Sequence, residues 1–117
     1  MQKIYLSDSG PKVSPAIYGF YRWEEEELSY SKMEGIIQLC LSLGINTFDH
    51  ADIYGGYHAE ELFGKIIKAN GIKREEIVLF TKSGYVAPHY LKPEIKVPHY
   101  NSSGKHLLTS LEQSLRN

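Results

Sequence analysis

The sequence predicts an α/β fold of about three βα units preceded by a short β-hairpin. A short apolar strand, a polar loop and an amphipathic helix follow one another about three times within the 117 residues. The run Ile77–Thr81 is almost continuously apolar, as is typical of a parallel strand buried on both faces. No low-complexity segment or polar linker divides the chain, so we expect residues 1–117 to belong to one domain.

The N-terminal segment predicts a hairpin and a first main strand. Residues 3–14 read as two short strands around a turn at Asp8–Pro11. Residues 16–23 predict the first main strand, which contains Gly19. The acidic run Glu24–Glu27 predicts a solvated loop leading to a helix, because surface charge runs usually have that role.

Two helices and a strand follow. Ser31 and Glu34 have capping-box spacing, and an apolar stripe continues from there to a glycine stop at Gly44. The second strand is predicted at Ile45–Asp49, and a second helix ends at Asn70–Gly71. Its apolar stripe consists of Leu62, Phe63, Ile66 and Ile67.

The C-terminal part predicts a long loop and a third helix. The loop runs from residue 83 to about residue 103, and loops of this length are usually functional or disordered. The helix is expected to begin at Ser102 or Ser103 and to turn four leucines inward, namely Leu107, Leu108, Leu111 and Leu115. Its apolar stripe is still running at Asn117. Three βα units also leave a buried-type strand with an unpaired edge, so we expect the chain to be the N-terminal part of a larger protein.

Composition excludes several classes of function. The net charge of −1 offers no electrostatic footprint for nucleic acid or an anionic membrane. No apolar run reaches the ~18 residues of a membrane span, and the first ten residues lack the apolar core of a secretory signal. Cys40 is the single cysteine, so it cannot form an internal disulfide, and a reducing compartment, the cytoplasm, is the expected location.

Three reactive side chains are predicted to meet at one edge of the sheet. Asp49 ends the second predicted strand, Lys82 ends the third, and Tyr54 lies in the loop after Asp49. Reactive groups collect at the C-terminal ends of parallel strands, and neighbouring strands are only about 4.8 Å apart. The side chains of these three residues can therefore converge.

Such a cluster suits a general acid. A phenol with a reference pKa near 10 is a poor proton donor at neutral pH, and a nearby ammonium makes a phenol more acidic. We expect Lys82 to act on Tyr54 in this way and Asp49 to hold Lys82 charged and in place. A phenol of this kind is suited to protonating a carbonyl oxygen. No side chain donates hydride, so a nicotinamide cofactor is implied.

These residues resemble a known family. Residues 48–55, Phe-Asp-His-Ala-Asp-Ile-Tyr-Gly, resemble the signature Asp-x-Ala-x-x-Tyr-Gly of the aldo-keto reductase superfamily. Residues 80–82 resemble the strand that carries the family's catalytic lysine, residues 58–64 are also family-like, and the N-terminal double strand is similar to the hairpin closing the bottom of its barrel. The resemblance covers essentially all of this chain but only about the first third of a family member.

The resemblance implies the N-terminal part of a (β/α)8 TIM barrel and the reduction of an aldehyde or ketone by NADPH. It implies Tyr54 as proton donor, tuned by Lys82 and Asp49. It also implies cofactor contacts near the nicotinamide and a substrate pocket. The cofactor contacts would come from Gly19, Phe20, Tyr21 and Asp49, and the pocket from Trp23, Tyr54 and the loop after Lys82.

Two family features are missing from the 117 residues. The fourth catalytic residue, usually a histidine at the end of the fourth strand, would follow Asn117, and His89, His99 and His106 are not placed to replace it. The segments that hold the adenine and phosphate groups come from the last strands of the barrel. We therefore expect the chain alone to be inactive or nearly so.

Two alternatives stay open. Asp49, His50, Asp52 and His58 are potential metal ligands, as in a metal-dependent TIM-barrel hydrolase. Successive strand residues point to opposite faces, however, which makes convergence of Asp49 with His50 difficult. The chain could also belong to a non-catalytic binding or regulatory subunit with the aldo-keto reductase fold.

Overall fold

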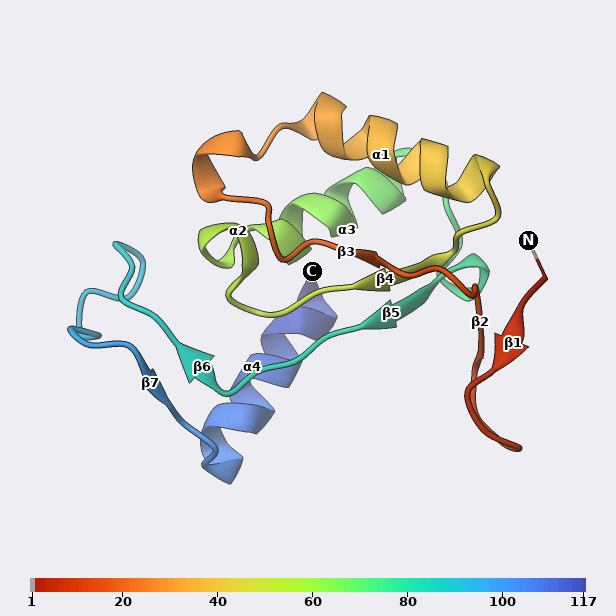
Figure 1. The fold of residues 1–117 in the computed structure, drawn as a ribbon. Helices are drawn as coiled ribbons and strands as arrows, with labels where there is room; N and C mark the ends of the chain where they lie inside the picture. The colour runs from red at the N-terminus through yellow and green to blue at the C-terminus, as the bar shows by residue number, and fades with distance from the viewer. Residues whose placement is uncertain (1) are drawn as a thin grey trace.

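A computed structural model describes residues 2–117, apart from the side chain of Glu27, and its centre is a three-stranded parallel sheet (Figure 1). The strands follow the order β3–β4–β5 and comprise Tyr18–Gly19, Thr47–Asp49 and Val78–Phe80. A separate antiparallel pair, β1 (Ile4–Tyr5) and β2 (Lys12–Val13), precedes the sheet. The hairpin and the three parallel strands are as predicted, although each parallel strand is shorter than the sequence pattern suggested.

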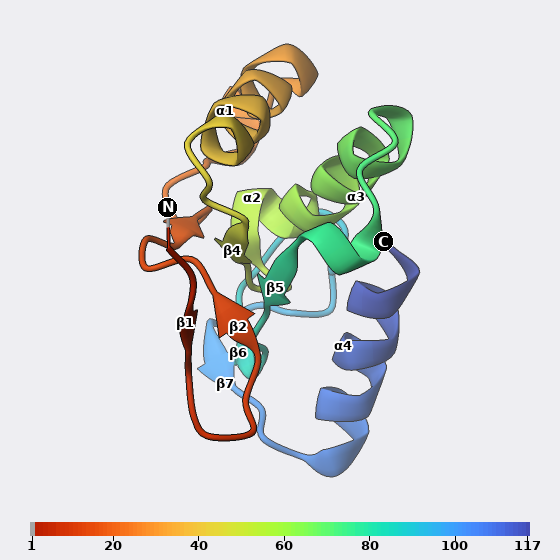
Figure 2. The same ribbon diagram turned by 90° about the vertical axis from the view of Figure 1, so that its right-hand side faces the viewer.

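Two helices cover one face of the sheet (Figure 2). They are α1 (Tyr30–Ser42) and α3 (Ala59–Ala69). The core between them and the sheet contains Phe20, Phe48 and Phe63, and the first two are fully buried. Rings at these positions pack 5.2–6.3 Å apart, and aromatic contacts of this kind add to the stabilisation from burial.

The other face of the sheet is open, which corrects one expectation about β5. Val78, Leu79 and Phe80 are only half-buried, whereas their apolar run predicted burial on both sides. In the described part of the chain β5 pairs only with β4, so it is an edge strand with one covered face. The apolar run thus shows that both faces of this strand are suited to burial, although only one face is covered in residues 2–117.

The start of α1 differs from the prediction. The N-cap is Ser29, whose hydroxyl accepts a hydrogen bond from the backbone N–H of Lys32, rather than Ser31. The predicted capping-box partner, Glu34, instead accepts a hydrogen bond at 2.7 Å from the side-chain amide of Asn70, the C-cap of α3. The predicted stop is confirmed, because Gly44 adopts a φ of 77° that glycine tolerates well.

The long loop has structure of its own. It contains the antiparallel pair β6 (Tyr85–Val86) and β7 (His99–Tyr100) and an isolated bridge between His89 and Lys92. The period-two pattern in these two-residue strands is too short to have predicted the pair from the sequence. Short 3₁₀ turns, η1 (Glu25–Glu27) and η2 (Arg74–Glu76), complete the connections.

The last helix, α4 (Gly104–Arg116), begins where the sequence predicts but packs differently. Ser103 caps it by accepting from the N–H of His106. The prediction of inward-facing leucines is wrong, since the exposed fractions of Leu107, Leu108, Leu111 and Leu115 are 39%, 63%, 49% and 77%. Polar contacts hold the helix instead: Ser110 donates to Asp52, and Ser114 donates to Glu60 at 2.7 Å. None of the helices in residues 2–117 is long and apolar enough to cross a membrane.

Candidate active site at the carboxyl ends of the sheet

Asp49 and Lys82 form an ion pair at the carboxyl end of the sheet. Asp49 ends β4 and lies opposite Phe80 of β5, with Lys82 two residues further along the chain. The Lys82 Nζ donates to both carboxylate oxygens of Asp49, at 3.0 Å and 2.9 Å, and to the carbonyl oxygen of His50 at 2.8 Å. Three acceptors thus use the full donor capacity of one ammonium and fix its position.

This arrangement keeps Lys82 charged. Partial burial disfavours the ammonium, but the hydrogen bond to Asp49 and the nearby phenol of Tyr54 favour it more strongly, and the pKa of Lys82 is raised above its usual value. Its side chain remains about half exposed, at 52%. A permanently charged group therefore faces the solvent at the edge of the sheet.

Tyr54 lies directly beside this ion pair. Its residue is 9% exposed, and the Lys82 Nζ lies 4.8 Å from the centre of its ring. The exposed ring of Tyr21 meets it edge-on, with a centroid distance of 5.7 Å. The structure therefore brings together Asp49, Tyr54 and Lys82, as the sequence predicted.

A left-handed turn sets the direction of the chain after Tyr54. Tyr54 begins the short helix α2 (Tyr54–Tyr57), and the next three residues, Gly55, Gly56 and Tyr57, have φ values of 56°, 60° and 69°. Side chains are strained in this region, which glycine adopts at little cost. The Gly-Gly pair in the sequence thus makes possible the turn that follows the phenol.

Gly19, Tyr21 and Trp23 lie at the end of β3, on the side of Asp49. Gly19 is opposite Asp49 in the sheet, and a Cβ added to it would lie 3.9 Å from an Asp49 carboxylate oxygen. These three residues also line a cavity of about 440 Å³ together with Arg22 and Lys32. The Trp23 ring is itself buried, and its indole N–H donates to the Tyr18 hydroxyl at 3.2 Å.

Phe20 lies apart from the other predicted cofactor residues. Its side chain is fully buried on the helix-covered face and stacks on the His50 ring at 4.3 Å. Alternation along the strand explains this placement, since Phe20 follows Gly19 and points to the opposite face. Only the backbone of residue 20 lies at the edge where a cofactor would bind, and its N–H already donates to the Asp49 carbonyl at 3.0 Å.

His50 also points into the helix layer. It is 3% exposed, and within residues 2–117 neither ring nitrogen has a hydrogen-bond partner. Burial lowers the pKa of His50 to about 4, so the ring is neutral at pH 7. Asp49 and His50 therefore diverge, and no group of three or more His, Cys, Asp or Glu side chains in the described residues could hold a metal ion.

Sequence reasoning missed a second polar cluster next to this site. Glu25, which the acidic run assigned to a solvated loop, pairs with His89 at 2.8 Å and accepts from the Tyr90 hydroxyl at 2.9 Å. Glu25 and His89 are 64 residues apart, so no local sequence pattern could have predicted that they pair. The sequence shows the acidic run and the histidines, but only the fold brings them into contact.

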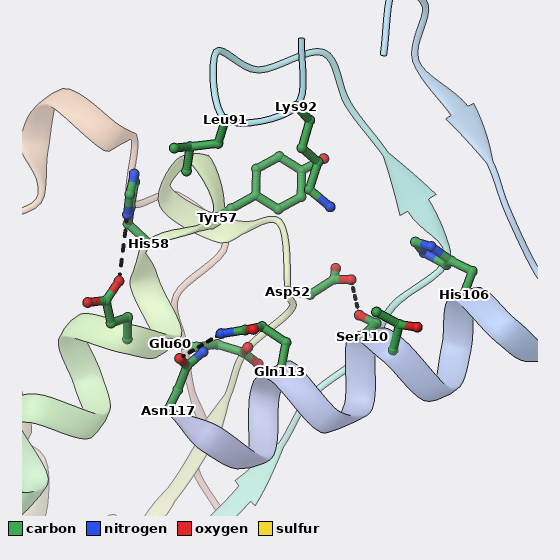
Figure 3. Close-up of a pocket in the computed structure, with 12 residues that line it drawn as sticks. Asp52, Tyr57, His58, Glu60, Leu91, Lys92, His106, Ser110, Gln113 and Asn117 are labelled. Carbon is green, nitrogen blue, oxygen red and sulfur yellow. Dashed lines mark hydrogen bonds and ion pairs between the residues drawn. The ribbon is translucent and has the colours of Figure 1, made fainter. Parts of the chain in front are cut away.

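A cavity of about 390 Å³, lined mostly by polar residues, lies between α3, α4 and the segment after β6 (Figure 3). Asp52 and Ser110 are hydrogen-bonded within it, and Tyr57 and Lys92 face each other at its upper rim. Asp52 is also joined to the active-site strand, because its N–H donates to the Lys82 carbonyl at 3.2 Å.

Comparisons with known proteins place the chain in a family. The family model described as the aldo/keto reductase family matches residues 16–117, so the chain belongs to that family. It is 43% identical over 117 residues to an uncharacterized oxidoreductase, YcsN, of Bacillus subtilis, covering all of this chain and 39% of that protein. It is 40% identical over 117 residues to a 6-dehydroglucose reductase of Agrobacterium fabrum, covering 99% of this chain and 39% of the reductase.

A solved structure shows the same fold. The aldo-keto reductase AKR11C1 from Bacillus halodurans, in its holo form, superposes with a TM-score of 0.79 at 28% identity. The match covers 99% of this chain and 36% of that structure. The hairpin and parallel βα units thus correspond to the N-terminal part of the family's TIM barrel, and the chain spans about two fifths of the length of these relatives.

Proposed function

We propose that the protein is an NADPH-dependent aldo-keto reductase that reduces an aldehyde or ketone to an alcohol. The observation that carries the proposal is the ion pair of Lys82 with both oxygens of Asp49, placed 4.8 Å from the centre of the Tyr54 ring. A phenol beside an ammonium that is held by a carboxylate is suited to general-acid catalysis. Membership of the aldo/keto reductase family supports the same chemistry.

In the proposed reaction Tyr54 gives its hydroxyl proton to the carbonyl oxygen of the substrate. The Lys82 ammonium stabilises the negative charge that develops on the phenol oxygen, since opposite charges attract strongly at a partly dehydrated site. Asp49 keeps Lys82 protonated and prevents its long side chain from turning into solvent. Tyr54 afterwards regains a proton from water.

The residues present fit the nicotinamide end of the cofactor. Gly19 offers backbone without a side chain beside Asp49, and a Cβ there would project toward the carboxylate. The Tyr21 ring, 70% exposed, offers a flat surface next to Tyr54. When bound, NADPH would supply the hydride that reaches the carbonyl carbon. We assign Gly19, Tyr21, Asp49 and the backbone of Phe20 to the cofactor, and Trp23 and Tyr54 to the substrate pocket.

The proposed substrate class rests on the reaction type and on the names of two relatives. We propose small aldehydes and ketones as substrates, and oxidised sugars are included because two relatives carry the name 6-dehydroglucose reductase. We also propose that residues 1–117 form the N-terminal portion of one barrel domain and are inactive alone. The single cysteine, Cys40, is buried and free, which suits a reducing location such as the cytoplasm.

The test is an assay of the intact protein with NADPH, and separately NADH, against aldehydes, ketones and oxidised sugars. Consumption of NADPH that the Tyr54→Phe variant loses would support the proposal. Equal turnover in both proteins would remove Tyr54 from its role. Cofactor binding without turnover by the unmodified protein would instead favour the alternative of a non-catalytic subunit, and stoichiometric zinc in the purified protein would favour the hydrolase.

A further inference from the structure

The polar cluster around Glu25 connects three segments that are distant in the sequence. Glu25 comes from η1, His58 precedes α3, and His89 and Tyr90 come from the loop between β6 and β7. The Tyr90 hydroxyl donates to one Glu25 oxygen at 2.9 Å, and the His89 Nε2 lies 2.8 Å from the other. The His58 Nε2 is 3.1 Å from the Tyr90 hydroxyl and 3.5 Å from Glu25. One carboxylate thus holds three side chains.

The backbone fixes the direction of the bond between His89 and Glu25. The N–H of Leu91 donates to the His89 Nδ1 at 3.2 Å, so in the neutral ring the proton is on Nε2 and points to Glu25. The hydrogen bonds from His89 and then Tyr90 lower the pKa of Glu25 below its usual value. The carboxylate is therefore ionised at neutral pH and accepts from both partners.

This cluster packs closely against the turn that follows Tyr54. A Cβ added to Gly56 would lie 2.5 Å from an oxygen of Glu25 and 2.9 Å from the His89 Nε2, and one added to Gly55 would lie 2.9 Å from Leu28. The left-handed turn is therefore enclosed by η1 on one side and by the loop on the other. Such close contact leaves little room for the backbone at positions 55 and 56 to move.

Tyr57 completes the connection between the turn and the loop. Its hydroxyl donates to the Ala87 carbonyl and accepts from the Ala87 N–H, both at 2.9 Å. The Lys92 Nζ lies 4.5 Å from the centre of the Tyr57 ring, and Figure 3 shows Leu91 and Lys92 above that ring. The titratable groups that contact Glu25 are thus His58, at the start of α3, and His89 and Tyr90 from the loop.

We propose that Glu25 is a positioning residue that clamps the segment 87–91 onto the turn at 55–57 and so fixes the backbone that presents Tyr54. This inference rests on the proposed function only for its effect on catalysis. The clamp itself depends on the contacts of Glu25, His89 and Tyr57. It assigns a role to the acidic turn and to two histidines that the proton-transfer cluster does not use.

The first test measures amide hydrogen exchange in the intact protein. The reporter is the Ala87 N–H, which is bonded to Tyr57 and to neither mutated residue. In Glu25→Ala and in His89→Ala we expect its exchange to accelerate at least about tenfold, because each variant removes a charge-assisted hydrogen bond. The Val78 N–H, which donates to Asn46 at 2.8 Å in the sheet, should be unchanged. Glu24→Ala, at an exposed neighbouring position, is the matched control.

The second test measures kinetics with NADPH and a carbonyl substrate of the intact protein. Glu25→Ala should lower kcat about tenfold with KM for NADPH unchanged, since the clamp acts on the presentation of Tyr54. Glu25→Gln keeps one oxygen acceptor and should recover part of the loss. A change in KM alone would contradict a positioning role at Tyr54.

The two tests separate the clamp from the proposed function. If the unmodified protein reduces no carbonyl compound, the proposed function fails, yet exchange at Ala87 still decides whether the clamp exists. If Ala87 exchanges in Glu25→Ala at the rate of the unmodified protein, the clamp is overturned whatever the activity.

Discussion

Asp49 and His50 are adjacent in the sequence, yet they belong to opposite faces of the sheet with opposite chemistry. Asp49 is on the open face, about one-third exposed and bonded to the Lys82 ammonium. His50 is on the helix-covered face, buried between the rings of Phe20 and Phe63 with no hydrogen-bond partner among the described residues. One peptide unit therefore separates a charged site exposed to water from an apolar core.

The difference teaches where function and stability are located in this part of the barrel. Groups on the open face keep their charges because water and ion partners solvate them. Groups on the covered face instead pack against α1 and α3 and form the apolar core. Substitutions on the open face should therefore change activity with little effect on folding. Substitutions on the covered face should have the reverse effect.

The largest expected effect is at the Tyr54 hydroxyl, beside the ion pair of the open face. Tyr54→Phe keeps the ring and its packing but removes the proton donor, so we expect kcat for carbonyl reduction in the intact protein to fall about 10²- to 10⁴-fold. The free energy of unfolding should change little. Tyr30→Phe, at an exposed position on α1, is the control and should keep full activity.

The next largest expected effect is a loss of stability on the covered face, at Phe63. Its ring contacts Phe20, Phe48 and His50, and truncation of a buried phenylalanine to alanine typically costs about 3–5 kcal/mol. We expect Phe63→Ala to lower the free energy of unfolding, measured with urea, by an amount in that range. Leu39→Ala, at an exposed position on α1, should lower it much less. Similar losses in both variants would contradict the assignment of the core.

The pH dependence of folding should report on His50. Its pKa is about 4 in the folded protein against 6.5 for the free side chain, so the unfolded chain binds the extra proton first as the pH falls. Stability should therefore decrease from about pH 6.5 to pH 4, by about 3 kcal/mol in total for a shift of this size. In His50→Phe this part of the dependence should disappear, while His99→Gln, at an exposed position, should retain it.

The smallest expected effect is on stability at the ion pair. Lys82 and Asp49 are about half and one-third exposed, and ion pairs in such positions contribute only about 0–1 kcal/mol. Lys82→Met should therefore unfold at nearly the same urea concentration while losing carbonyl reductase activity. A loss of stability as large as that of Phe63→Ala would show that the open face is part of the core, and the comparison of the two faces would fail.

Much of the site could be predicted because it depends on local rules. The strand at 78–80 follows from an apolar run and the strand at 47–49 was also predicted, and parallel strands bring Asp49 and Lys82 to the same edge whatever the details of packing. The helix stop at Gly44 and the start of α4 at Ser103 also depend on neighbouring residues alone.

Other features could not be predicted, since they depend on contacts between distant segments. The N-cap of α1 is Ser29 rather than the predicted Ser31, and Glu34 accepts a hydrogen bond from Asn70, the C-cap of α3. The leucines of α4 form a regular stripe, yet bonds from Ser110 and Ser114 hold that helix with its stripe largely exposed. Periodicity states which side of a helix is apolar but not what covers it.

The sequence by itself determined the order of the βα units and the convergence of Asp49, Tyr54 and Lys82, because strand direction and the spacing of residues along the chain are local properties. Only the tertiary structure decided that Phe20 and His50 share a buried stack and that Glu25 binds His89 across 64 residues. Those pairings depend on how the layers are packed in three dimensions, where burial and mutual hydrogen bonding select partners that no short stretch of sequence identifies.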